Sequence, residues 1–168
     1  MAQIANISNS MFDQILPTFG TPSINLPVWN EGQKMFISSE YESSNGNRYY
    51  KGLRFCDQLA IVETWGTYHT WTYINSVEIY TFDGNKPKLA GKRTFDKQFY
   101  DLDFIKAQTE VMVQEFIQGQ LKIQNVNMPM VRIEDKAKVL VDKSYKSFLD
   151  EDYNPRVQIM LPVLTANQ

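Results

Sequence analysis

The sequence predicts an α+β fold, in which an antiparallel β-meander of about five strands is followed by two amphipathic helices and a C-terminal strand. Three observations lead to this prediction. Residues 34–95 alternate apolar and polar side chains between short turn signals, residues 99–118 and 134–149 repeat apolar side chains at helical spacing, and residues 156–163 alternate again. Strands that come before helices in this way are typical of a sheet with helices packed on one face.

The strongest strand signal is a hairpin around Asn45-Gly46, because this residue pair tolerates the positive φ angles of a type I′ turn. With these two residues as the loop, Tyr41 is predicted to lie opposite Tyr50, and Phe36 opposite Phe55. Aromatic pairs that meet in this way support the register. Both faces of the hairpin carry apolar side chains, so we expect each face to be covered at least in part.

The next strands are predicted at residues 59–65, 70–82 and 88–95, with a turn at 66–69 between the first two. The segment DGNKP, residues 83–87, marks a second hairpin turn. Its loop residues are either Asp83-Gly84 or Gly84-Asn85, and the two alternatives differ by one residue in register.

Two helices follow, the first ending at Gly119 and the second before Asn154-Pro155. Residues 121–131 alternate weakly and are consistent with a strand or a loop. Residues 1–32 are predicted to be an extended, proline-containing segment, with one short helical turn after Ser10. The whole chain, residues 1–168, is expected to form a single domain.

Composition excludes several classes of protein. A net charge of −2 provides no basic stripe for duplex DNA. Cys56 is the only cysteine, which rules out an intramolecular disulfide and a thiolate metal cluster within one chain. The first residues lack the features of a secretory signal, and no apolar run reaches membrane-spanning length. A cytoplasmic location without membrane contact is therefore expected.

The segment WGTYHTWTYIN, residues 65–75, concentrates aromatic side chains around the only histidine. Together with neighbouring strand residues it forms a candidate binding surface, made of Trp65, Tyr68, His69, Trp71, Tyr73, Tyr49, Lys51 and Arg54. Alternation sends Trp71 and Tyr73 to one face of their strand and Ile74 to the other. The competing interpretation is that these aromatic residues simply pack a corner of the sheet. Whether the Trp71–Tyr73 face lies beneath a helix or faces a partner is left open.

Catalysis by histidine would have to use His69, with Glu63 or Asp57 as the group that orients it. His69 falls in a predicted turn, where polar residues are common for conformational reasons alone, so no catalytic residue is assigned. Metal binding is not expected either. Asp101 and Asp103 could hold Mg²⁺, but carboxylates are also favoured at a helix start.

The sequence lacks the Walker A pattern, the Rossmann fingerprint, HExxH and the nucleophile elbow GxSxG. We therefore expect a non-enzymatic interaction or structural protein without a cofactor, acting on a protein partner or as a homo-oligomer. Small proteins that are rich in Asn, Gln and Tyr and lack enzyme motifs are frequent among phage and mobile-element accessory proteins. One alternative is a single-stranded nucleic-acid binder, which would use the aromatic sheet and the basic residues of 86–93. A second alternative is a small enzyme centred on His69.

Overall fold

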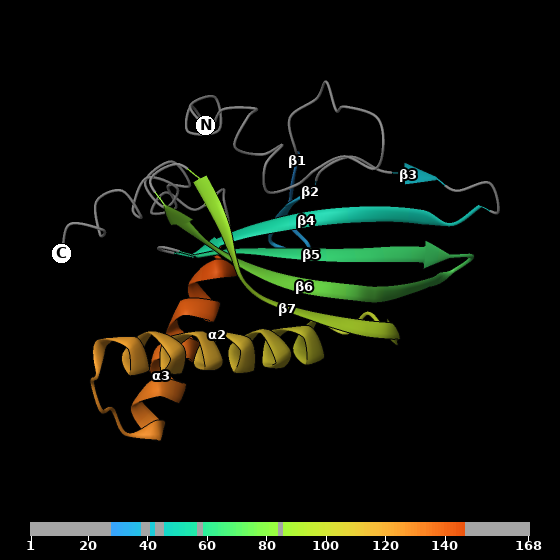
Figure 1. The fold of residues 1–168 in the computed structure, drawn as a ribbon. Coiled ribbons are helices and arrows are strands. Elements are labelled where there is room, and N and C mark those ends of the chain that lie inside the picture. Colours follow the sequence, from blue (N-terminus) through green and yellow to red (C-terminus); the bar gives the residue numbers. More distant parts are fainter. Residues whose placement is uncertain (1–27, 38–40, 43–45, 57–58, 84–85, 147–168) are drawn as a thin grey trace.

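The computed structural model describes residues 28–37, 41–42, 46–56, 59–83 and 86–146 (Figure 1). Within them one antiparallel sheet has the strand order β1-β2-β4-β5-β6-β7, and β3 also pairs with β4. The strands are β1 (Val28–Asn30), β2 (Met35–Ile37), β3 (Tyr41–Glu42), β4 (Arg48–Cys56), β5 (Leu59–Tyr68), β6 (Trp71–Asp83) and β7 (Lys86–Phe99), and the helices are α2 (Leu102–Gln124) and α3 (Met130–Ser144). The predicted α+β class is confirmed. The predicted C-terminal strand and the helical turn after Ser10 lie outside the described residues.

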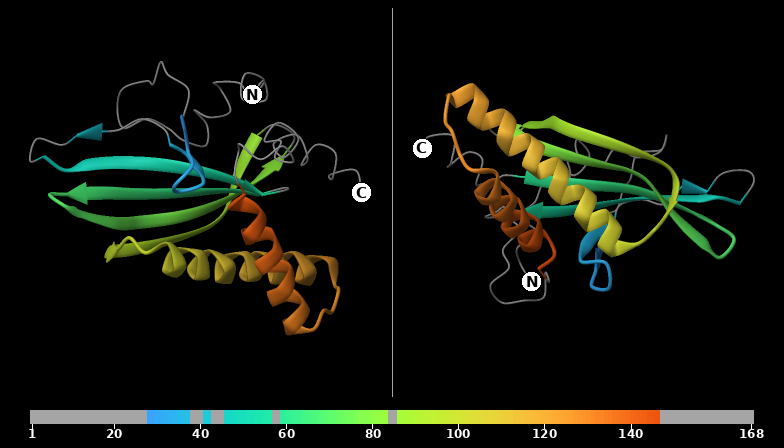
Figure 2. Two further views of the ribbon diagram at one scale, coloured as in Figure 1. Left: turned by 180° about the vertical axis from the view of Figure 1, so that it is seen from behind. Right: turned by 90° about the horizontal axis from the view of Figure 1, so that it is seen from below.

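Both helices lie on the same face of the sheet, with α2 running along the strands and α3 crossing beside it (Figure 2). The core between these layers joins Ile61, Ile74 and Ile79 of the sheet to Ile105 and Val113 of α2. Each such side chain, when fully buried, contributes about 1.5–3 kcal/mol to the hydrophobic driving force. The face turned toward the helices is called the helix face below, and the opposite one the outer face.

The hairpin around Gly46 differs from the prediction. The structure pairs Tyr41 with Tyr49 rather than with Tyr50. The paired positions Glu42 and Arg48 leave residues 43–47 between them, which is a longer connection than a two-residue turn. Gly46 does adopt a positive φ of 85°, as the Asn-Gly signal implies. The signal therefore located the turn correctly but gave the wrong loop length, and the register is shifted by one residue.

The prediction that Phe36 faces Phe55 is also wrong, because β2 pairs Phe36 with Leu53. The shift here is two residues, which leaves every side chain on its predicted face. Phe36, Leu53 and Phe55 are all buried on the outer face, and Met35 is buried on the helix face. Both faces of this part of the sheet are thus removed from water, as expected.

The β5–β6 connection is shorter than predicted. Strand β5 continues through Tyr68, and only His69 and Thr70 form the turn, so residues 66–68 are strand. Farther from this turn, the β5–β6 register shifts between Thr64 and Trp65 of β5, which marks a β-bulge. At the next hairpin Asp83 pairs with Lys86, which agrees with the Gly84-Asn85 alternative.

The first helix does not end at Gly119 but continues to Gln124, so residues 121–124 are helical rather than a strand or loop. A glycine inside a helix costs only about 1 kcal/mol relative to alanine, and Leu121 beyond it still packs against the core. Asn125 ends the helix in the left-handed conformation, with its N–H donating to carbonyls of the last turn.

The second helix spans Met130–Ser144, so it begins and ends earlier than the predicted 134–149. Pro129 immediately precedes its first turn, where the missing N–H costs nothing. At the start of α2, the Asp101 side chain caps the helix by accepting a 3.0 Å hydrogen bond from the N–H of Asp103. In the described part of the chain, no helix combines the length and apolar character that a membrane crossing needs.

Candidate interaction surface

The strand register divides the candidate residues between the two faces of the sheet. Tyr49 lies opposite Gly66, which lies opposite Tyr73, and Tyr68 lies opposite Trp71. Because Ile74 belongs to the core beneath the helices, its neighbour Tyr73 points to the outer face. Tyr49, Tyr68, Trp71 and Tyr73 therefore share the outer face at the β5–β6 end, and we call these four residues the aromatic surface. Neither of the described helices, α2 and α3, covers the Trp71–Tyr73 face.

Tyr73 forms the base of the aromatic surface. Its ring lies over the backbone of Gly66, where an added Cβ would come within 2.7 Å of the Tyr73 Cζ atom. Only glycine permits so close an approach of ring and strand. Burial, and then the hydrogen bond with Tyr49, raise the pKa of the Tyr73 phenol. The hydrogen bond between Tyr49 and Tyr73 thus joins the rings of β4 and β6.

Tyr68 and Trp71 form the accessible part of the aromatic surface, with exposed fractions of 46% and 36%. The Trp71 ring packs on the Tyr73 ring at a centroid distance of 5.1 Å, which fixes its orientation. The Tyr68 ring meets the His69 ring edge-on at 4.1 Å. His69 is exposed and has a φ of 55°, so the turn presents it to solvent beside the aromatic surface.

Trp65 and Arg54 are buried on the helix face and are not part of the aromatic surface. Trp65 stacks on Tyr50 at 5.4 Å and meets Tyr100 edge-on at 5.9 Å. Arg54 pairs with Glu63 on the neighbouring strand, and neither side chain is exposed. The prediction of one surface made of eight residues was therefore wrong for Trp65 and Arg54, which lie on the face opposite the aromatic surface.

Lys51 is the one basic candidate on the outer face, where it lies two residues from Tyr49 on β4 and opposite Thr64. Burial lowers the pKa of Lys51. The negative charge of Glu78 opposes this shift, and the positive charge of Lys92 adds to it. Glu78 is also 3.9 Å from Lys92. Lys51 and Lys92 thus share a neighbouring carboxylate, Glu78, and burial disfavours the charged form of Lys51.

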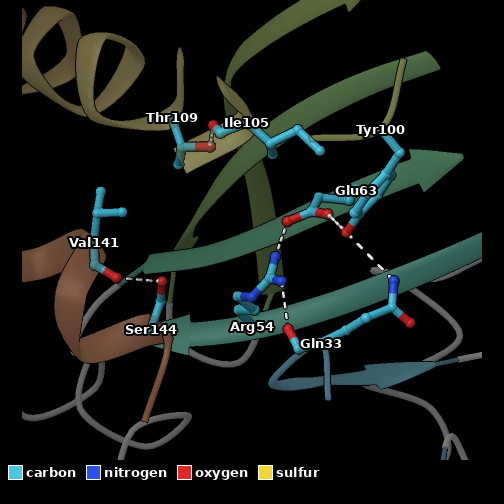
Figure 3. Close-up of polar contacts among 8 residues, drawn as sticks. All are labelled: Gln33, Arg54, Glu63, Tyr100, Ile105, Thr109, Val141 and Ser144. Carbon is cyan, nitrogen blue, oxygen red and sulfur yellow. Dashed lines mark hydrogen bonds and ion pairs between the residues drawn. The ribbon is translucent and has the colours of Figure 1, made fainter. Parts of the chain in front are cut away.

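A buried polar network on the helix face was not anticipated from the sequence (Figure 3). The Tyr100 hydroxyl donates to Glu63 Oε1 at 2.8 Å, and the Gln33 amide donates to that hydroxyl at 3.4 Å. The Arg54 guanidinium lies 4.1 Å from the ring centroid of Tyr145, just after α3. A signal did exist, since Arg54 and Glu63 are charged residues at inward positions of two consecutive apolar strands, but recognising it required the register.

Residues of this network contact one another, with Arg54 against Glu63 and Tyr145 and with Tyr100 against Glu63, which points to a structural role. Burial raises the pKa of Tyr100 and of Tyr145, and the charge of Arg54 opposes that shift in both. Both phenols therefore stay protonated. Tyr100 donates a hydrogen bond to Glu63, and the Tyr145 ring packs against the Arg54 guanidinium.

The geometry gives His69 little catalytic support. Glu63, one of the two groups considered for orienting it, faces the opposite side of the sheet and pairs with Arg54. The other, Asp57, lies outside the described residues. Within the described ranges, no three His, Cys, Asp or Glu side chains gather in a way that could hold a metal ion. Asp101 and Asp103 serve the start of α2, as shown above.

Three hollows open on the described surface. About 390 Å³ lies between β7 and α2, about 330 Å³ between the two helices, and about 260 Å³ at the α2–α3 connection. None of these three is lined by the aromatic surface. Comparison with known proteins found no matching family, no matching curated protein and no matching solved structure.

Proposed function

We propose that this protein is a non-enzymatic interaction protein that binds a partner protein through its aromatic surface. The observation that supports this most is the joint exposure of Tyr68 and Trp71 on one face, as a directly opposed cross-strand pair. Tyrosine and tryptophan are enriched among the residues that dominate binding energy at protein interfaces. They supply a large contact area while losing only two side-chain torsions on binding.

Preorganisation supports the same proposal. Trp71 rests on buried Tyr73, and Tyr73 rests on Gly66 and bonds to Tyr49, so the exposed Trp71 ring stands on an ordered base. A surface that is ordered before binding avoids the entropic cost of fixing side chains in the complex, about 0.5–1.5 kcal/mol for each. The aromatic surface lines none of the three hollows, and a small molecule is usually enclosed in a pocket, so a macromolecular partner suits it better.

Single-stranded nucleic acid is a weaker candidate for the same surface. Binders of that class combine stacking rings with cations that track the phosphates. Arg54 is buried in an ion pair, and Lys51 is partly buried, which lowers its pKa and disfavours its charged form. A protein partner is therefore the occupant that the charges around the rings favour.

The test compares capture of cellular proteins by the tagged full-length chain and by two variants of matched design. The first carries Tyr68→Ala and Trp71→Ala on the aromatic surface. The control carries Val131→Ala and Val139→Ala, which remove two exposed apolar side chains from α3, away from the aromatic surface. We expect a protein that the wild type and the control capture alike and the aromatic variant does not. For the purified partner, the Kd of the aromatic variant should be at least about tenfold higher than that of the wild type, or 1.4 kcal/mol.

Three results would overturn this proposal. Equal capture by the wild type and the aromatic variant would remove the surface from the interaction. The protein would instead be a nucleic-acid binder if it bound labelled single-stranded DNA or RNA, if salt weakened that binding, and if the aromatic variant lost it. Light scattering that shows an oligomer of the wild type, dissociated in the aromatic variant, would identify the occupant as a second copy of the chain. Circular dichroism on every variant controls for loss of the fold.

A further inference from the structure

A groove of about 390 Å³ runs between β7 and α2, away from the aromatic surface. Strand β7 is the last strand in the order of the described sheet, so the groove lies along a sheet edge. Its apolar part comes from Met112, Phe116 and Ile123 of α2 and from Leu89 of β7. Leu89 and Ile123 are both largely exposed.

Two glycines make the groove hollow. Gly91 of β7 and Gly119 of α2 both line it, and a Cβ added at either position would meet no atom within 4 Å. Neither residue has a positive φ, so the backbone does not require glycine at either place. Close packing does not require it either. Their small size instead leaves room in the groove, although Gly119 weakens the helix by about 1 kcal/mol relative to alanine.

The groove carries positive charge. Its lining includes three basic residues, Lys88, Lys92 and Arg93, and one acidic residue, Glu115. Lys92 lies 3.9 Å from Glu78. Arg93, which points toward α2, bonds to Gln108 at 2.7 Å and to Glu115 at 2.9 Å, so its charge is partly compensated. Lys88 lies opposite Thr81 on the same face of the strand and is exposed at the mouth of the groove. The cationic edge therefore favours an acidic ligand.

We propose that the β7–α2 groove binds an extended acidic segment of a partner protein, which pairs with β7 as an additional strand. Edge strands offer backbone N–H and C=O groups to such a segment, and alternate side chains of the segment reach into neighbouring hollows. Acidic side chains meet Lys88, and apolar ones fill the space left by Gly91 and Gly119. A second copy of β7 is a poor occupant, because two cationic strands repel each other.

The binding test uses a defined probe, a fluorescent peptide of about ten residues, the length of a long strand, that carries Val or Thr at its centre and Glu or Asp toward both ends. Anisotropy should rise on titration with the full-length protein at low salt and rise less as salt screens the charges. A peptide with Lys in place of each acidic residue should bind at least about tenfold more weakly. A peptide with alternate amides N-methylated, on the edge that would face β7, should lose binding to a similar extent.

Protein variants locate the site. Gly119→Met should fill the groove and weaken the acidic peptide at least about tenfold, or 1.4 kcal/mol. Ala107→Met adds the same side chain at an exposed position of α2 outside the groove and should bind as the wild type does. Lys88→Glu gives an independent loss through charge, should Gly119→Met fail to fold.

Several results would overturn the proposal. No binding of the acidic peptide at low salt would do so, as would equal affinity of Gly119→Met and Ala107→Met when both are folded. Unchanged binding of the N-methylated peptide would rule out strand pairing. The variant with Tyr68→Ala and Trp71→Ala should bind the peptide normally, so this test and that of the aromatic surface fail separately.

Discussion

Arg54 and Glu63 form an ion pair between β4 and β5 in which neither side chain is exposed to solvent. Burial of an ion costs several kcal/mol, and only a well-placed partner offsets it. Here Tyr100 donates a hydrogen bond to Glu63, and the Tyr145 ring lies over Arg54. The pair thereby connects the sheet to the residue that follows α3, and its loss affects the whole domain.

Removal of one partner should be far more destabilising than removal of both. Arg54→Met leaves Glu63 buried without its counter-ion and should lower the free energy of unfolding by about 3–5 kcal/mol. The double variant Arg54→Met with Glu63→Leu should be more stable than Arg54→Met alone. Urea denaturation gives these differences.

The exposed ion pair between Lys106 and Asp142 is the matched control, since Asp142→Asn should cost at most about 1 kcal/mol. The losses of stability in Arg54→Met and in Glu63→Leu, measured singly, can be summed and compared with the loss in the double variant. If the two were equal, Arg54 and Glu63 would not be coupled.

The element order was predictable because each kind of periodicity persists over a long segment. Alternation from residue 34 and helical spacing from residue 99 suffice for the α+β class. Boundaries were less predictable, because they depend on small energy differences. Gly119 is a plausible helix end, but packing beyond it outweighs about 1 kcal/mol of helix propensity. Asn45-Gly46 allows more than one loop length, and the paired strands decide between them.

The candidate surface was predictable only in part. Alternation correctly sends Trp71 and Tyr73 to one face and Ile74 to the other. Whether a helix covers a given face depends on packing between distant segments, and no local pattern reports it. For the same reason Trp65 and Arg54 could not be separated from the exposed rings before the register was known.

Gly66→Ala should destabilise the protein by about 1–3 kcal/mol, as overpacking of a filled site does. The added Cβ would come within 2.7 Å of Cζ and Oη of Tyr73, so the ring would have to leave its place on the strand. Gly91→Ala is the matched control, because nothing lies within 4 Å of its added Cβ. Thermal unfolding measures both. The double variant Gly66→Ala with Tyr73→Leu should lose less stability than the two single variants together. Strictly additive losses would show that the clash is absent.

His69→Gly should raise the free energy of unfolding by up to about 1 kcal/mol, because left-handed backbone is strained for any residue with a Cβ. His69 has a φ of 55°, and its imidazole contacts the exposed Tyr68 ring. His69→Ala retains the Cβ and should bring no such gain in urea denaturation. A loss of stability in His69→Gly would show that the ring contact outweighs the backbone strain.

Stability should fall at alkaline pH because of Tyr80. Burial, together with the charge and hydrogen bond of Glu78, raises the pKa of Tyr80 from 10.0 to about 12. Below pH 10 the phenol is protonated in both the folded and the unfolded state, so it makes no pH-dependent contribution. Between these two values the unfolded chain releases the proton and the folded chain retains it, so the free energy of unfolding falls as pH rises.

Tyr80→Phe should therefore lose less stability than the wild type between pH 10 and 12 in urea denaturation. Absorbance of the ionised phenol gives a second measurement on the folded protein. Glu78→Gln removes the neighbouring negative charge and should move the titration of Tyr80 to lower pH. If Tyr80→Phe and the wild type lost the same stability over this range, the alkaline sensitivity would belong to other groups. An unchanged titration in Glu78→Gln would leave burial as the whole cause of the raised pKa.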